Sequence, residues 1–505
     1  MILPRDEFDE ALIRNVRPED WKNPEPKGKY DLVAIGAGSA GLTAAAGAAG
    51  LGARVALIER AELGGDWLNV GCVPSKALLR SAHVAAEVRD AARFGVRVPD
   101  GVDVDFAAVM RRMRELRARI SPVDSVERFS GELGVDVYLG EARFAGPKTI
   151  EVDGTRLHFK KAVVATGARP LVPPVPGLAE AGVLTNETIF NLTELPRRLL
   201  VIGGGPIGCE LSQAFCRFGA DVTLIEMSSH LLNGEDLDAT QILCSTFERD
   251  GIDLRLGTTA TKVASQGGGR AAKLVTLESN SRSETISVDE ILVSAGRAPN
   301  VEGLGLEDAG VGYDVQRGIV VDDYLRTTNR RIFAAGDVCV GTRFTHVAEF
   351  TARNVIQNAL FFPTKKLSSL TIPWCTYTSP EIAHVGLYPR DAEAQGIEID
   401  TWVQQLSDVD RAIAEGDTDG FVKVYTKRGS DKIVGATIVA RHAGDLISEV
   451  SVAMAGRVGL GRLSSVIHPY PTQADAIRQI ANAYNRTRLT PGVKRLFEAL
   501  MRLRR

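Results

Sequence analysis

The sequence predicts an α/β protein in which one parallel, doubly wound domain is inserted into another, followed by a C-terminal α+β domain. Two segments resemble each other, and each reads as an apolar strand, a glycine-rich turn, an alanine-rich helix and a second strand. From residue 367 the pattern changes to strands such as GFVKVYTK and KIVGATIVA, which are typical of an antiparallel sheet. A length of 505 residues fits about three domains.

The two similar segments, residues 30–60 and 198–227, each carry a GxGxxG motif. Its glycines are Gly36, Gly38 and Gly41 in the first segment and Gly203, Gly205 and Gly208 in the second. The first glycine permits a tight turn, the second lets a pyrophosphate approach the backbone, and the third lets the helix lie close to the strand. Glu59 and Glu226, each 23 positions after the first glycine, could accept hydrogen bonds from a ribose. Two complete units favour two Rossmann-like dinucleotide-binding domains over purely structural βαβ units.

Later strand ends complete this organisation. KAVVATGARP (161–170) and EILVSAGRAPN (290–300) are apolar strands that run into glycine turns, and RRIFAAGDVCV (330–340) places Asp337 just after a strand. FTHVAEFTARNVIQNALF then reads as a helix. The predicted parts are an N-terminal arm (1–28), a first dinucleotide-binding domain (29–171 and 295–366), a second one (172–294), the α+β domain (367–489) and a basic amphipathic helix (490–505).

Composition excludes several classes of protein. A net charge of −3 gives no electrostatic reason to expect nucleic acid as a partner. The first residues lack a secretory signal, and the uncharged run 40–53 is too short to span a membrane, so it is expected to be a tightly packed helix. Six cysteines without CxxC or zinc spacing suggest a cytoplasmic enzyme and predict no metal site. The C-terminal helix is expected to dock on its own subunit or a dimer partner rather than on a membrane.

The motifs GGDWLNVGCVPSK, ATGARP, AAGDVC, FTHVAEFTARN, IPWCTYTSPEIAHVGL and HPYPTQAD follow one another in this order. Residues 29–490 therefore resemble the FAD-dependent pyridine nucleotide–disulfide oxidoreductases, in the branch that contains mercuric reductase and dihydrolipoyl dehydrogenase. The resemblance implies FAD in the first domain, a nicotinamide dinucleotide in the second, and a homodimer formed by the C-terminal domain. It also implies that each subunit completes the active site of its partner.

The resemblance implies roles for individual residues. Asp337 would bind the ribityl chain, the helix that starts near His346 would point its N-terminus at the flavin pyrimidine ring, and Lys76 would pair with Glu210 beside the flavin. The residues implied in FAD binding are Gly36, Gly38, Ser39, Ala40, Gly41, Glu59, Arg60, Gly65, Asp66, Lys76, Ala165, Thr166, Gly167, Gly336, Asp337, Phe344, Thr345 and His346. Those implied for the nicotinamide dinucleotide are Gly203, Gly205, Pro206, Ile207, Gly208, Glu226 and Gly296. Because Glu226 is followed by MSSH, without Arg or Lys, we expect NADH to be preferred over NADPH.

One of the two redox cysteines of the family is absent. By alignment Cys72 is the inner sulfur, next to the flavin, and Trp67 replaces the outer thiol that attacks the substrate. Residues five apart in a straight helix are separated by about 7.5 Å of rise, more than the usual disulfide Cα separation of about 4.4–6.8 Å. The pair must therefore lie where a helix only begins, which Pro74 fits. A dithiol–disulfide cycle is not expected here, and Trp67 either fills the substrate channel or stacks on an aromatic ligand.

The C-terminal motif also departs from the family. The usual His–Glu pair becomes Tyr470 and Asp475, and Tyr, with a reference pKa of about 10, is a poor base at neutral pH. His468 could substitute, although a structural role is favoured. Cys339 and Cys375 are expected to be small buried hydrophobic residues rather than metal ligands, and the absence of a C-terminal cysteine pair argues against mercury reduction.

The leading hypothesis is an NADH-oxidising FAD enzyme that passes electrons to a quinone, a metal ion, dioxygen or a small sulfur species. One alternative uses Cys72 alone, as a thiolate favoured by its helix start, to reduce a peroxide, persulfide or mixed disulfide. Another alternative is a degenerate FAD- and NAD-binding redox sensor without turnover.

Overall fold

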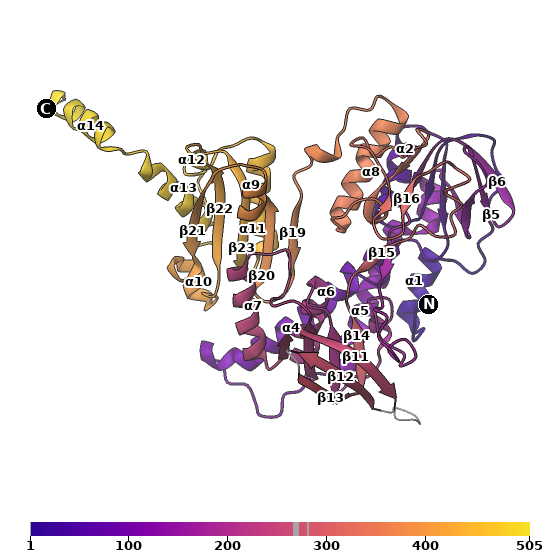
Figure 1. Cartoon of the computed structure of the whole chain (residues 1–505), viewed down its shortest axis with the longest axis horizontal. Helices are drawn as coiled ribbons and strands as arrows, with labels where there is room; N and C mark the ends of the chain where they lie inside the picture. The colour runs from indigo at the N-terminus through magenta and orange to yellow at the C-terminus, as the bar shows by residue number, and fades with distance from the viewer. Residues whose placement is uncertain (1, 266–271, 280–281, 505) are drawn as a thin grey trace. The chain divides into compact units, whose positions relative to one another are not determined.

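The computed structural model describes residues 2–265, 272–279 and 282–504, which form two compact units (Figure 1). The first unit contains Met1–Ser229 and Asp250–Leu370, and the second contains His230–Arg249 and Thr371–Arg505. Both nucleotide-binding motifs and the redox motif lie in the first unit, and the antiparallel domain lies in the second. The predicted boundary at residues 366/367 falls near the end of the first unit.

A mostly parallel sheet forms the base of the first unit, with strand order β3-β2-β1-β6-β5-β4 and β18 paired to β6. Its strands are β1 (Tyr30–Ile35), β2 (Val55–Glu59), β3 (Asp136–Leu139), β4 (Ala142–Phe144), β5 (Thr149–Val152), β6 (Thr155–Val164) and β18 (Ile332–Ala334). β1 is fully flanked, since Val33 pairs with Ala56 on one side and Ala162 on the other. The late strand β18 adds in parallel beside β6, so residues on both sides of the inserted domain build one sheet.

Helices α2 (Ser39–Gly50) and α8 (Thr345–Leu360) pack against each other beside this sheet (Figure 1). Small residues allow this close approach, because a Cβ on Gly47 would lie 2.5 Å from Cδ1 of Ile356. The predicted alanine-rich helix at 40–53 and the predicted helix after Phe344 are thereby confirmed.

The second sheet of the same unit is parallel, with order β10-β9-β8-β14. Its strands are β8 (Arg198–Ile202), β9 (Asp221–Glu226), β10 (Asp253–Leu256) and β14 (Glu290–Val293), and α6 (Pro206–Phe218) connects β8 to β9. A meander of β11 (Thr258–Ser265), β12 (Lys273–Ser279) and β13 (Arg282–Val288) precedes β14. β7 (Ala168–Pro170) follows β6 of the first sheet in the chain, and β15 (Arg297–Pro299) follows β14 of the second. These two strands form an antiparallel pair.

The N-terminal arm contains a packed helix, α1 (Glu7–Val16), that the sequence analysis did not specify. Asp6 caps it by accepting hydrogen bonds from the backbone N–H groups of Phe8 and Asp9. The carboxylate of Asp9 lies 2.7 Å from Nη2 of Arg117 on α5 (Phe106–Ile120), and both side chains are at most 1% exposed. The arm is therefore an integral part of the first unit.

The remaining elements of the first unit connect these layers. They are α3 (Gly65–Asn69), α4 (Cys72–Asp90), η1 (Ala91–Phe94), η2 (Ser121–Asp124), η3 (Arg128–Glu132), η4 (Ile189–Asn191), β16 (Tyr313–Asp314), β17 (Gly318–Ile319), η5 (Gly336–Val338) and η6 (Leu367–Ser369).

The second unit is built on an antiparallel sheet of order β19-β20-β23-β22-β21. Its elements are α7 (Leu237–Asp250, of which Asp250 belongs to the first unit), β19 (Pro373–Thr376), β20 (Glu381–Gly386), α9 (Pro389–Ala394), β21 (Ile399–Gln405), η7 (Leu406–Asp408), α10 (Asp410–Glu415), β22 (Phe421–Lys427), β23 (Ile433–Ala440), α11 (Ala443–Ala455), α12 (Leu460–Leu463), α13 (Asp475–Thr487) and α14 (Pro491–Leu503). The predicted strands GFVKVYTK and KIVGATIVA are the antiparallel pair β22 and β23. Among the described residues, no helix is long and apolar enough to cross a membrane.

Candidate cofactor and active site

The first glycine-rich turn joins β1 to α2 and is closely packed. Gly36 has φ +97°, and a Cβ there would lie 2.5 Å from the carbonyl oxygen of Ala165. A Cβ on Gly41 would lie 1.7 Å from the carbonyl oxygen of Gly36. Glycine is required at both positions, the first for its backbone conformation and the second for space. The turn leaves the N-terminal N–H groups of α2, which begins at Ser39, available for an anion.

The two glutamates that end β2 and β9 make equivalent hydrogen bonds. Glu59 accepts from the backbone N–H of Ala37 at 2.6 Å and of Ala61 at 2.8 Å. Glu226 accepts from Gly204 at 2.7 Å and from Ser228 at 2.9 Å. Each carboxylate is thus held against the glycine turn of its own segment, where a bound nucleotide places its ribose. Burial raises the pKa of Glu59, and the two N–H donors oppose that shift.

The second glycine turn, between β8 and α6, repeats this close packing. Gly203 has φ +109°, and a Cβ there would lie 2.7 Å from the carbonyl oxygen of Ser294. A Cβ on Gly208 would lie 1.9 Å from the carbonyl oxygen of Gly203. Pro206 is the first residue of α6, a position where its missing N–H costs nothing. Both predicted nucleotide turns therefore have the required geometry.

Several elements meet around Asp337, which lies on η5 between β18 and α8. A Cβ on Gly336 would lie 3.3 Å from Cβ of Ala40 and 3.1 Å from Cβ of Ala348, so η5 touches both α2 and α8. Burial raises the pKa of Asp337, while the guanidinium groups of Arg297 and Arg343 oppose the shift. The buried Nε atoms of these two arginines have no hydrogen-bond partner within the described chain.

These features fit FAD. The glycine-rich turns and the helix N-termini that follow them suit its phosphates. The buried Nε atoms of Arg297 and Arg343 could donate hydrogen bonds to an acceptor on the cofactor. Gly36, Gly41, Glu59, Asp337 and Arg297 are the residues that would hold the cofactor. The two arginines were not predicted as site residues, although Arg297 directly follows the predicted Gly296 in the quoted GRAPN segment.

The redox motif contains two helices separated by a break. α3 carries Trp67 and ends at Asn69, and α4 begins at Cys72 after Gly71. Positions 67 and 72 therefore do not share one straight helix. This agrees with the expectation above, because two cysteines five apart in a straight helix would be too far apart for a disulfide. The Trp67 side chain is half-buried and packs against the hydrophobic core of the first sheet. Cys72 is exposed, and its Sγ lies 3.2 Å from Oγ1 of Thr345, the first residue of α8.

An ion pair connects α4 with α6. Nζ of Lys76 lies 2.9 Å from Oε2 of Glu210, and the glutamate side chain is 6% exposed against 37% for the lysine. The two residues are 134 positions apart, so only the motif match had linked them. Lys76 lies one helical turn after Cys72, which places a cation and a thiol on the same part of α4.

The C-terminal motif lies in the second unit, and its residues have separate partners. Tyr470 is 74% exposed and donates a hydrogen bond to Asp410 at 2.8 Å, which raises the pKa of the phenol. Although burial alone would raise it, hydrogen bonds from Gln479 and Arg478 lower the pKa of Asp475.

His468 is also engaged within the second unit. Its Nε2 lies 2.9 Å from Oε1 of Glu449, and the imidazole is 5% exposed. Its Nδ1 lies 3.1 Å from the carbonyl oxygen of Val466. Both ring nitrogens therefore have partners inside this unit, an arrangement typical of a structural histidine.

Family models match almost the whole chain. The model of the pyridine nucleotide-disulphide oxidoreductases matches residues 30–352, and the model of their dimerisation domain matches residues 372–481. The chain belongs to the pyridine nucleotide-disulphide oxidoreductase family. This oxidoreductase is thus of an FAD-binding family that uses NAD(P)H, and its dimerisation domain supports a homodimer.

Individual relatives agree with this assignment. The oxidoreductase is 35% identical to a mercuric reductase from Staphylococcus aureus over 459 residues, which cover 91% of this chain and 83% of the relative. It is 33% identical to a dihydrolipoyl dehydrogenase from Bacillus subtilis (strain 168), covering 90% and 98%. Among solved structures, the HOCl-induced flavoprotein disulfide reductase RclA from Escherichia coli aligns with TM-score 0.79 at 27% identity, covering 90% and 99%. LpdA from Mycobacterium tuberculosis aligns with TM-score 0.81 at 28% identity, with the same coverage.

All six cysteines of the oxidoreductase lie among the described residues as thiols rather than disulfides. Cys339 is a packed residue whose thiol pKa is raised by burial, and its Sγ lies 3.5 Å from the carbonyl oxygen of Gly336. Cys375 is partly exposed, and its Sγ lies 3.9 Å from Oε2 of Glu381. Across the described parts of the chain, no group of three or more His, Cys, Asp or Glu side chains is arranged to hold a metal ion.

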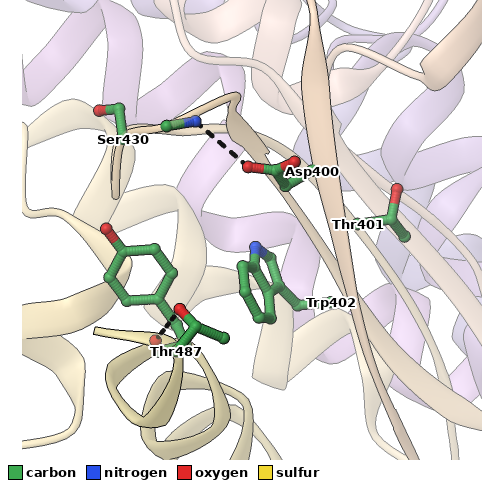
Figure 2. A pocket seen from close by; sticks show the side chains of 7 residues that line it. Asp400, Thr401, Trp402, Ser430 and Thr487 are labelled. Carbon is green, nitrogen blue, oxygen red and sulfur yellow. Dashed lines mark hydrogen bonds between the residues drawn. The ribbon is translucent and has the colours of Figure 1, made fainter. Parts of the chain in front are cut away.

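A shallow pocket of about 520 Å³ lies elsewhere in the second unit (Figure 2). Trp402 and Tyr484 form its aromatic wall, with ring centroids 5.3 Å apart. Asp400 accepts a hydrogen bond from the backbone N–H of Gly429 at 3.3 Å. The residues that line it include none of the predicted site residues.

Proposed function

We propose that this oxidoreductase oxidises NADH through FAD and delivers the electrons to an acceptor that is not a dithiol-exchanged disulfide. The observation that carries the proposal is Trp67. A half-buried indole packed on the hydrophobic core stands where the disulfide mechanism needs a second thiol. The hydroxyl of Thr345 is the neighbour of Cys72 instead.

FAD, when bound, supplies hydride acceptance from NADH and electron release to the acceptor. The chain's own residues bind and orient it. The glycine turns position the phosphates, Glu59 and Glu226 receive the riboses, and Asp337 lies on η5, between β18 and α8. The positive end of α8 would favour the electron-rich form of bound flavin, and Lys76, paired with Glu210, would supply a positive charge to it.

The proposed nicotinamide substrate is NADH. The Glu226 carboxylate is fixed by two backbone N–H donors, so it can accept from a ribose hydroxyl and repels a 2′-phosphate. The exposed Met227 and the following Ser228, Ser229 and His230 bring no Arg or Lys to offset that repulsion.

The acceptor class is a quinone, a metal ion, dioxygen or a small sulfur species. The names of relatives favour testing metal ions early, because several are mercuric reductases and RclA has been solved as a Cu(II) complex. Cys72 is an exposed sulfur at the start of α4 and could meet a soft metal ion as substrate.

The experiment is anaerobic mixing of the FAD-loaded enzyme with NADH, followed by an acceptor screen. Rapid bleaching of the flavin and its recovery with one acceptor class is the expected result. Lipoamide is the control, because it requires the absent thiol. Failure of NADH to bleach the flavin would instead support the redox-sensor hypothesis.

Cys72 carries the second candidate function. In this cycle the Cys72 thiolate attacks hydrogen peroxide, and with one proton this gives a sulfenic acid and water; the hydride equivalent of NADH, passed through the flavin, then returns the sulfenic acid to the thiolate with loss of a second water. Its exposure and its place at a helix start favour this chemistry. Loss of peroxide-dependent NADH oxidation in Cys72→Ser, with NADH bleaching of the flavin intact, would distinguish it from acceptor reduction by the flavin alone.

A further inference from the structure

The C-terminal helix α14 (Pro491–Leu503) has no packed face within the described chain. Thr490 caps it by accepting a hydrogen bond from the backbone N–H of Val493 at 3.4 Å. None of its residues is buried, and in Figure 1 it extends beyond α13, away from the sheet of its own unit. Docking on its own subunit is therefore not observed, docking on a dimer partner stays a prediction, and the apolar face of α14 is uncovered within the described chain.

The helix separates apolar from charged side chains by position. The spacing i, i+3, i+4, i+7, i+8 gives one face formed by Val493, Leu496, Phe497, Leu500 and Met501. Four of these are large side chains exposed by 46% to 62%. The opposite face carries Lys494, Arg495, Glu498 and Arg502. An apolar stripe bordered by cations is the pattern of helices that lie in a membrane interface.

The charge of this segment is opposite to that of the rest of the chain. Residues 491–505 contain five basic residues and one acid, which gives +4, so the remaining chain carries −7 of the total −3. An anionic surface therefore attracts this segment, although the rest of the chain carries a net negative charge. Beyond a Debye length of about 8 Å at physiological salt, the charge of the body is largely screened.

The position of α14 in the sequence argues against docking of this helix on the partner subunit as part of the family's dimerisation domain. The family's dimerisation domain matches residues 372–481, and α14 begins ten residues after it ends. The helix thus lies outside the part of the chain that relatives share for dimerisation.

We propose that α14 docks on an anionic lipid bilayer, lying in the plane of the interface with its apolar face among the acyl chains. Its 13 residues are about 20 Å long, and a bilayer accepts such a face without a complementary pocket. A homodimer would present two copies, so that binding of the first raises the effective concentration of the second. The inference does not depend on the electron acceptor.

The test is co-sedimentation of the full-length, FAD-loaded protein with vesicles of phosphatidylcholine and phosphatidylglycerol. We expect the bound fraction to fall with added salt and to be much lower on pure phosphatidylcholine. The double variant Phe497→Asp/Leu500→Asp should weaken binding by about tenfold or more. Ile413→Asp is the control, because it replaces an exposed apolar residue by one aspartate on α10, where the side chain is 53% exposed, and it should bind like wild type.

Light scattering in solution tests whether α14 docks on a second copy of the chain instead of on a bilayer. Equal mass for wild type and the double variant, together with the loss of vesicle binding, supports the proposal. Vesicle binding that is absent from wild type or equal in the double variant overturns it. A double variant that falls to half the mass also overturns it, since the occupant is then a second copy of the chain. Vesicle binding is measured without turnover, so its failure is distinct from a failure of NADH oxidation.

Discussion

The Lys76 ammonium lies 2.9 Å from the Glu210 carboxylate, although the two residues belong to different helices and the glutamate is almost fully enclosed. Lys76→Met would leave that carboxylate without its cation. We expect a loss of roughly 1–3 kcal/mol in the free energy of unfolding, below the full cost for a buried pair because Lys76 still reaches solvent. Urea denaturation of the holoenzyme measures it. The control Lys160→Met removes an exposed pair with Asp31 and should cost less than about 1 kcal/mol; equal losses would contradict the argument.

Nucleotide choice should depend on Glu226. Wild type is expected to have the higher kcat/KM for NADH. The double change Glu226→Ala/Met227→Arg removes the repelling carboxylate and adds a guanidinium, so the ratio should shift toward NADPH by about tenfold or more. Met227→Leu is the matched control for the exposed neighbouring position. A wild-type preference for NADPH would rule out this role for Glu226.

Disulfide substrates should be poor. Wild type should show negligible turnover of lipoamide and glutathione disulfide, because no second thiol stands beside Cys72. Trp67→Cys restores a thiol five positions before Cys72, across the break between α3 and α4. Thiol titration of the oxidised variant should then find two fewer thiols than cysteines. Trp67→Ser, which opens the same space without sulfur, should show no such loss.

Cys72 should be visible in the flavin spectrum. In ordinary members of the family the inner sulfur becomes a free thiolate only after the disulfide is reduced, whereas here no outer sulfur holds it. We expect long-wavelength charge-transfer absorbance in the enzyme as isolated. Cys72→Ser should abolish this band while FAD stays bound. A plain oxidised flavin spectrum that Cys72→Ser leaves unchanged would contradict this role for Cys72.

Asp124 should make stability depend on pH. The residue is 8% exposed, its Oδ2 has no hydrogen-bond partner in the described chain, and burial raises its pKa to about 6. The unfolded carboxyl titrates at about 3.9, so the unfolded state loses its proton first as pH rises. The resulting penalty is absent below pH about 4, grows up to pH about 6, and reaches roughly 2–3 kcal/mol above it.

Asp124→Asn should therefore be more stable than wild type at pH 7.5, with the difference shrinking toward pH 4. Urea denaturation at the two pH values measures it, and Asp90→Asn on the exposed end of α4 is the control. A difference that does not change with pH would contradict this account of Asp124.

The sequence could predict those parts of the candidate site whose local geometry depends on residue spacing. Gly36 and Gly203 were recognisable because each turn needs a positive φ, and Glu59 and Glu226 because each ends a strand at a set distance. The role of Arg297 and Arg343 could not be read in this way. Their importance comes from burial beside Asp337, which depends on tertiary packing of segments that periodicity alone does not place.

The C-terminal motif shows a second limit. The alignment suggested Tyr470 and Asp475 as substitutes for a His–Glu pair, yet Tyr470 bonds to Asp410 and Asp475 to Arg478 and Gln479. Those partners lie on other turns and elements, so sequence spacing carried no information about them. The N-terminal helix α1 was likewise missed, because Asp9 is stabilised by Arg117, a residue 108 positions away.

The pairing of β18 with β6 has a consequence for the order in which the protein is made. Val164 leaves the ribosome 170 residues before its partner Ala334. At about 5–20 residues per second, the open side of β6 waits roughly 10–35 s for its last neighbour. During that time the nucleotide-binding insertion can fold, but Asp337 and α8 do not yet exist. The first sheet is therefore completed late in biosynthesis, and a truncated nascent chain keeps an unpaired strand edge that favours aggregation.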